Sequence, residues 1–115
     1  MPSNRSQNPT PGIAAFDMER ANQIYKGHTV ESDVEHNDDY ELAIGAQLIA
    51  FTPNEHMDAS DRYEMLLKLT GWDPYFCETV LEKSYKDRLR IAGALLAAEY
   101  DRVHYLETKR INGQK

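Results

Sequence analysis

The sequence lacks the residues that several classes of protein require. Its one cysteine, Cys77, cannot form an intramolecular disulfide, and no Cys/His spacing is typical of a zinc site. No window approaches the roughly 18 apolar residues of a transmembrane helix, and the polar residues 1–12 hold no apolar signal-peptide core. These absences predict a cytoplasmic protein with no membrane association.

Basic residues are missing from one long stretch. No Lys or Arg occurs between Lys26 and Arg62, although this stretch carries nine acidic residues. The whole net charge of −6 therefore lies in residues 1–57, whereas residues 58–115 hold ten acids and ten bases. Because binding to a nucleic-acid backbone needs a basic face, we expect no direct nucleic-acid binding.

Helix start signals predict an all-α fold. Cap residues precede proline at Thr10 and Asp73, Ser84 has an acid three residues on, and apolar residues recur at helical spacing between these points. We expect a single-domain bundle of four to five helices. Its expected segments are a flexible arm (1–12), a helical domain (13–110) and a flexible tail (111–115).

Two boundaries are predicted from weaker signals. Asp38, with Glu41 three residues on, is typical of a capping box at the start of a second helix. Ser60 is the expected cap of the third helix. The polar, acidic residues 28–37 are expected to form a loop.

The last helix is predicted to be long and central, because about 25 residues without proline follow Ser84. An apolar series recurs at helical spacing, and small residues around Gly93 would let another helix approach closely. The series comprises Leu89, Ala92, Leu96, Val103 and Leu106, and we expect it to face the core.

Glu99 interrupts that apolar series. A charge in such a position is costly unless it is paired or bound. Three interpretations follow: an ion pair with Arg102 or Arg20, a buried polar residue at an interface between copies of the chain, or a site carboxylate that faces a ligand or metal.

Acidic residues gather before and at the start of the second helix. The simplest interpretation is that they stabilise its N-terminus through the helix dipole. If this helix packs on the last one, Asp38 and Glu41 would instead converge with Glu99 and Asp101. The cluster comprises Glu31, Asp33, Glu35, His36, Asp38, Asp39 and Glu41.

Carboxylates that converge from two helices would hold Mg²⁺ in an all-α nucleotide pyrophosphohydrolase or a degenerate relative of one. That class has E-x-x-E on one helix and E-x-x-D on the next, whereas this chain has Asp38-x-x-Glu41 and Glu99-x-Asp101. The metal ligands of this alternative would be Asp38, Glu41, Glu99 and Asp101, and Lys26, Arg88 or Arg102 would contact phosphate.

Two stretches of the sequence resemble known motifs. Gly27-His28-Thr29-Val30-Glu31-Ser32-Asp33 with Glu41-Leu42-Ala43 resembles G-Y-T-x-E-H-D-D ahead of G-E-L-A, and residues 92–102 resemble A-G-A-L-I-A-A-E-I-D-R. The pair is similar to that of a group of small helical proteins of phage and prophage genomes. Ser32 stands where the group has histidine, and Tyr40 where it has glycine. The resemblance implies a phage-type accessory protein in the bacterial host cell.

We therefore expect a non-enzymatic protein that acts by binding through an acidic, tyrosine-rich face. Its partner would be a host protein, such as a component of a defence system, or a nucleotide-type ligand, and a second copy of the chain is a further candidate. No cofactor is expected, except Mg²⁺ under the enzyme alternative. Trp72 would be an exposed anchor in a turn. The candidate binding residues are Lys26, Glu31, Asp33, His36, Asp38, Glu41, Trp72, Glu99, Asp101 and Arg102.

Overall fold

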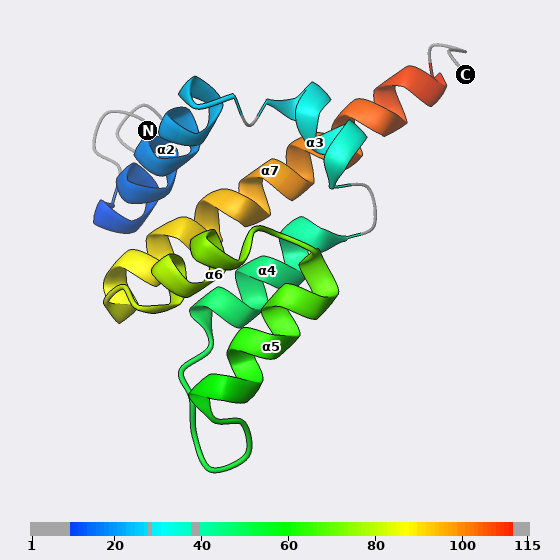
Figure 1. Ribbon diagram of the computed structural model, residues 1–115. Helices are drawn as coiled ribbons and strands as arrows, with labels where there is room; N and C mark the ends of the chain where they lie inside the picture. Colours follow the sequence, from blue (N-terminus) through cyan, green and yellow to red (C-terminus); the bar gives the residue numbers. More distant parts are fainter. Residues whose placement is uncertain (1–9, 28, 38–39, 112–115) are drawn as a thin grey trace.

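The computed structural model describes residues 10–27, 29–37 and 40–111, and these residues form six α-helices and no strand (Figure 1). The all-α class is confirmed, with one helix more than the largest number expected. The expected flexible segments at 1–9 and 112–115 lie outside the described residues, while Pro11 and Gly12 already belong to the first helix. The helices are α2 (Pro11–Tyr25), α3 (Val30–His36), α4 (Glu41–Ala50), α5 (Ala59–Thr70), α6 (Pro74–Leu81) and α7 (Tyr85–Ile111).

Three predicted helix starts are confirmed by side-chain caps. The side chains of Thr10, Asp73 and Ser84 each accept a hydrogen bond from the backbone N–H three residues on, at 3.4, 2.9 and 3.2 Å. α5 ends at Gly71, which adopts a left-handed φ of 70°. A glycine meets this requirement without the steric cost that a Cβ brings.

The acidic segment expected to be a loop contains a helix, so that prediction was wrong. Thr29 caps α3, and its hydroxyl accepts a hydrogen bond from the Ser32 N–H at 3.2 Å. The helix turns Asp33 into the protein, where it is 2% exposed. Polar composition concealed the helix, because the buried position of this short segment is occupied by an acid.

Two further predicted starts were also wrong. α4 begins at Glu41 after Tyr40, which has a left-handed φ of 69° and makes no side-chain cap hydrogen bond. The expected Asp38 capping box would have started the helix earlier, and Asp38 itself lies outside the described residues. α5 is capped by Asp58 rather than Ser60, with the Asp61 N–H donating to the Asp58 carboxylate at 2.8 Å.

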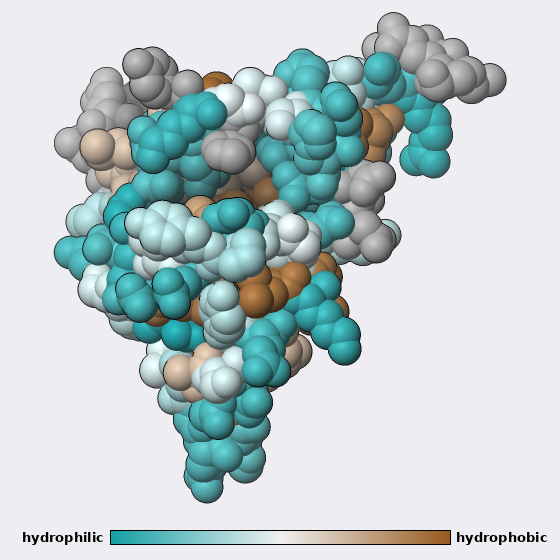
Figure 2. All heavy atoms as spheres, viewed as in Figure 1, coloured by the Kyte–Doolittle hydropathy of each residue, from teal (hydrophilic) through white to brown (hydrophobic). Residues whose placement is uncertain are grey.

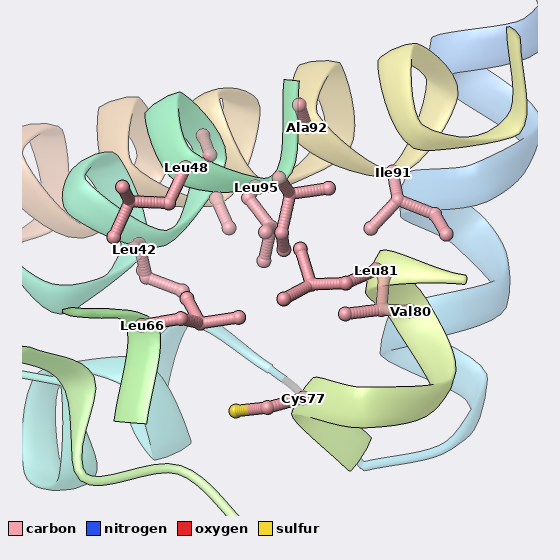
Figure 3. Close-up of a cluster of buried hydrophobic side chains, with 12 residues drawn as sticks. Leu42, Leu48, Leu66, Cys77, Val80, Leu81, Ile91, Ala92 and Leu95 are labelled. Atoms are coloured by element: carbon pink, nitrogen blue, oxygen red, sulfur yellow. The ribbon is translucent and has the colours of Figure 1, made fainter. Parts of the chain in front are cut away.

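α7 is the central element of the fold. It packs against α2, α3 and α4, and α5 in turn packs against α4 and α6 (Figure 1). The buried cluster lies between α4, α5, α6 and α7 (Figure 3). None of the described helices has the combination of length and apolar character that a bilayer crossing demands.

The buried face of α7 differs from the predicted one. Of the predicted series, Ala92 is buried as expected, whereas Leu89, Leu96, Val103 and Leu106 are 37–51% exposed. Ile91 and Leu95 lie in the core instead, together with alanines 94 and 98. The smaller residues face α4 and the core because α4 and α2 both press closely against this helix. The prediction failed because both sides of α7 carry apolar residues, and spacing alone does not say which one is buried.

Candidate functional site

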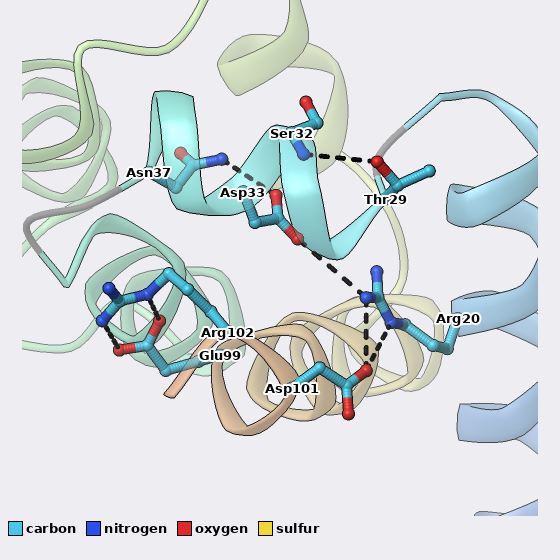
Figure 4. Close-up of polar contacts among 8 residues, drawn as sticks. All are labelled: Arg20, Thr29, Ser32, Asp33, Asn37, Glu99, Asp101 and Arg102. Carbon is cyan, nitrogen blue, oxygen red and sulfur yellow. Dashed lines mark hydrogen bonds and ion pairs between the residues drawn. The ribbon is translucent and has the colours of Figure 1, made fainter. Parts of the chain in front are cut away.

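Glu99 forms an ion pair within α7, which is one of the three roles that the sequence left open. Its carboxylate accepts two hydrogen bonds from the Arg102 guanidinium, at 2.8 and 2.9 Å (Figure 4). These hydrogen bonds raise the pKa of Arg102, and the negative charge of Glu41 acts in the same direction. Because Arg102 is 4% exposed, the Glu99 carboxylate is committed to holding a buried cation in place.

Asp101 points to the other side of α7. Its carboxylate accepts hydrogen bonds from Nη2 and Nε of Arg20 on α2, at 3.3 and 3.4 Å. The same Nη2 lies 4.0 Å from Oδ2 of the buried Asp33 on α3 (Figure 4). Arg20 therefore joins three helices through one guanidinium.

The predicted convergence of carboxylates does not occur for Glu99 and Asp101. Positions i and i+2 of an α-helix point about 200° apart around its axis. The carboxylates of Glu99 and Asp101 accordingly bind arginines on opposite sides of α7. Within the described ranges no three acidic, His or Cys residues are grouped closely enough to hold a metal ion. Asp38, the fourth expected ligand, lies outside those ranges.

Arg88, expected to contact phosphate under the enzyme alternative, is buried and structural. It is 7% exposed, and its Nη1 donates to the carbonyls of Ile49 and Phe51 at 2.9 Å each. Arg62 donates to the same Phe51 carbonyl at 2.6 Å. Burial, and secondarily the charge of Arg88, lowers the pKa of Arg62. The two cations hold the C-terminal end of α4, where exposed carbonyls favour positive charge.

A cleft of about 800 Å³ lies between α2, α3, α6 and α7. α7 and α6 supply an apolar floor of Ile91, Leu95, Ala98 and Val80, and α2 and α3 form the opposite wall. Figure 2 shows hydrophobic atoms at the bottom of the hollow, between the hydrophilic surfaces of α2–α3 and α6. Clefts of 300–1,000 Å³ with apolar linings and a few polar groups are typical of small-molecule sites.

Trp72 forms part of the cleft wall and is not the exposed anchor that the turn suggested. Its indole is partly buried against Gly45 of α4, and its Nε1–H donates to Oδ1 of Asn37 at 3.0 Å. The ring meets Phe76 edge-on at 5.9 Å between centroids. Asn37 in turn donates from Nδ2 to Asp33 at 3.1 Å, so the tryptophan is fixed to α3.

The rim of the cleft is mixed in charge. Lys26 and Lys83 are exposed on it, whereas Arg90 pairs with Glu19 and with Asp87. The hydrogen bond from Arg90, and secondarily a hydrogen bond with the Ser84 side chain, lower the pKa of Asp87. The two lysines are therefore the rim cations without a carboxylate partner among the ion pairs that the described residues make.

Four of the residues predicted from the sequence line this cleft: Lys26, Asp33, His36 and Trp72. Glu31 is exposed on α3 outside it, and Glu41, Glu99, Asp101 and Arg102 lie elsewhere. Sequence reasoning missed Phe76 and Thr79 of α6, and Lys83 in the turn that follows α6, all of which line the cleft. The spacing of three residues between Phe76 and Thr79 was a usable signal, because it places both on one face of a helix.

A comparison with protein-family models finds no match, and comparisons with curated proteins and with solved structures find none either.

Proposed function

We propose that this chain is a phage-type accessory protein that acts by binding, and that it takes a nucleotide-type ligand in the cleft between α2, α3, α6 and α7. The observation that carries the proposal is the cleft itself, with its apolar floor, its aromatic wall and two exposed lysines on the rim. A nucleotide combines a planar ring system with a negatively charged phosphate, and these two parts match the two kinds of surface.

The aromatic wall suits the ring system. Phe76 is 43% exposed, and it lies against an indole whose position is fixed by the hydrogen bond to Asn37. Aromatic side chains gain about 1–3 kcal/mol for each base that stacks on them. The amides of Asn22 and Gln23 and the hydroxyl of Thr79 line the same cleft, and they offer the donors and acceptors that base edges require.

The distribution of acids favours this ligand over a protein bound through an acidic face. Of the acids predicted to form that face, Asp33 is buried, and Glu41 is half-buried within the field of Arg102. Glu31 and Glu35 are the exposed acids of that cluster within the described ranges. Two separate carboxylates on a short helix make a weak electrostatic surface.

The experiment uses Trp72, the one tryptophan of the chain, as a probe inside the cleft. Fluorescence and calorimetric titrations with ATP, AMP and adenosine should show saturable binding that weakens as phosphates are removed. Lys83→Ala should reduce the affinity for ATP several-fold and leave adenosine unchanged. Lys68→Ala, on the exposed side of α5, is the matched control. Absence of saturable binding for all nucleotides, with and without Mg²⁺, would refute the proposal.

Assay of the same mixtures for released pyrophosphate separates binding from catalysis. Under the binding proposal the nucleotides are recovered intact. Turnover that Glu99→Gln abolishes would instead favour the pyrophosphohydrolase alternative.

A further inference from the structure

α7 carries an exposed apolar stripe on the side that faces away from the cleft. Leu89, Leu96 and Val103 are 37%, 51% and 38% exposed, and Tyr100 beside them is 73% exposed. We call these four residues the outer stripe. The cleft and core residues Ile91, Leu95 and Ala98 lie on the opposite side of the same helix. More than a third of the surface of each outer-stripe residue therefore remains uncovered by the described helices.

The spacing of the outer stripe is that of a helix that pairs with another helix. Leu89, Leu96 and Val103 recur every seven residues, which keeps them on one seam along about 21 Å of helix. Phe16 of α2 extends the surface sideways, because its ring lies directly over Gly93 and is still 40% exposed. A second helix could lie along this seam without disturbing the packing of α2.

We propose that the outer stripe binds the outer stripe of a second copy of this chain, in an antiparallel, two-fold arrangement. Charge complementarity selects this occupant. Lys86 and Glu107 are both exposed and stand three heptads apart, so they flank the same edge of the stripe at its two ends. In an antiparallel pair centred near Leu96, each Lys86 faces Glu107 of the other copy. A parallel pair would leave Lys86 of one copy and Glu107 of the other at opposite ends of the seam, where they cannot meet.

Shape agrees with the same register. The axis that pairs Lys86 with Glu107 also pairs Tyr100 of one copy with the Gly93 position of the other. There the exposed Tyr100 would meet the ring of Phe16 that covers the glycine. One surface used twice around a two-fold axis is the commonest arrangement of soluble dimers. In this surface, Lys86 and Tyr100 of each copy would contact Glu107 and Phe16 of the other.

The dimer is tested by sedimentation velocity and light scattering on the full chain, at about 1 to 500 µM. We expect a concentration-dependent dimer, which Leu96→Glu converts to monomer. Leu69→Glu is the matched control, since Leu69 is 46% exposed on α5, away from the stripe; it should leave the dimer intact. A wild-type chain that stays monomeric over the whole range, or equal loss with both variants, overturns the proposal.

Charge reversal tests the antiparallel register. Lys86→Glu and Glu107→Lys should each weaken the dimer several-fold, because each places two pairs of like charges together. The double variant restores opposite charges at both ends and should recover wild-type dimerisation. A double variant weaker than both single variants overturns the register. Circular dichroism on each variant confirms the fold, and nucleotide titration reports the cleft independently of the outcome.

Discussion

The Trp72 indole fills the space that a side chain at Gly45 would need. A Cβ at position 45 would lie 2.3 Å from the ring atom Cη2, closer than non-bonded atoms approach. The absence of a side chain at Gly45 thus lets Trp72, part of the cleft wall, pack directly against α4. The ring cannot move aside without breaking the hydrogen bond from its Nε1–H to Asn37.

Gly45→Ala should therefore destabilise the protein by about 1–3 kcal/mol, the usual cost of overpacking a filled site. Urea denaturation measures this change, and the emission of Trp72 should shift because its ring is displaced. Gly12→Ala is the control, since a Cβ there meets nothing within 4 Å; it should be neutral or stabilising. Equal effects of the two substitutions would contradict the packing argument.

Tyr40→Gly should stabilise the protein by up to about 1 kcal/mol, because a left-handed backbone costs a residue with a Cβ about this amount. Tyr40 has φ 69° and is 63% exposed, so little packing is lost with its ring. Thermal denaturation checks the sign. Tyr40→Ala keeps the Cβ and should bring no gain, which separates backbone strain from the loss of the ring.

Local signals in the sequence were sufficient for much of the fold. Thr10, Asp73 and Ser84 cap helices as predicted, since a cap depends on a few neighbouring residues. Longer-range features were not predictable in the same way. The burial of Asp33 depends on Arg20 from another helix, and spacing alone did not show which side of α7 faces the core.

The candidate site was predicted only in part, again because it depends on contacts between helices that are distant in the sequence. The sequence drew attention to Lys26, Asp33, His36 and Trp72, which do line the cleft. It grouped them with Glu99 and Asp101, which the turn of α7 directs to opposite sides. A cleft between helices depends on how helices that are distant in the sequence pack together, and no local pattern predicts that packing.

Arg20→Ala should destabilise the protein by about 3 kcal/mol, since it removes the cation beside a buried carboxylate. Arg20 is 8% exposed and Asp33 2%, and the two are 4.0 Å apart. Asp101→Asn is the matched control on the same guanidinium. The Asp101 side chain is 44% exposed, so its loss should cost less than about 1 kcal/mol. Chemical denaturation measures the loss of stability in both variants. A larger loss for Asp101→Asn than for Arg20→Ala would contradict the prediction.

The Cys77 thiol should resist alkylation in the folded protein and react readily once the chain is unfolded. Cys77 is fully buried, and burial, with a smaller effect of the Asp73 charge, raises the pKa of its thiol. The folded chain therefore keeps this thiol protonated at pH values where the unfolded chain begins to ionise it. The stability contributed by the protonated thiol is complete below the ordinary thiol pKa, and it is lost as the pH rises from that value through the raised pKa of the folded chain. Above about pH 8.5, the free energy of unfolding of the wild type should accordingly fall more steeply with pH than that of Cys77→Ala. Parallel pH profiles for the two proteins, or rapid alkylation under native conditions, would contradict this prediction.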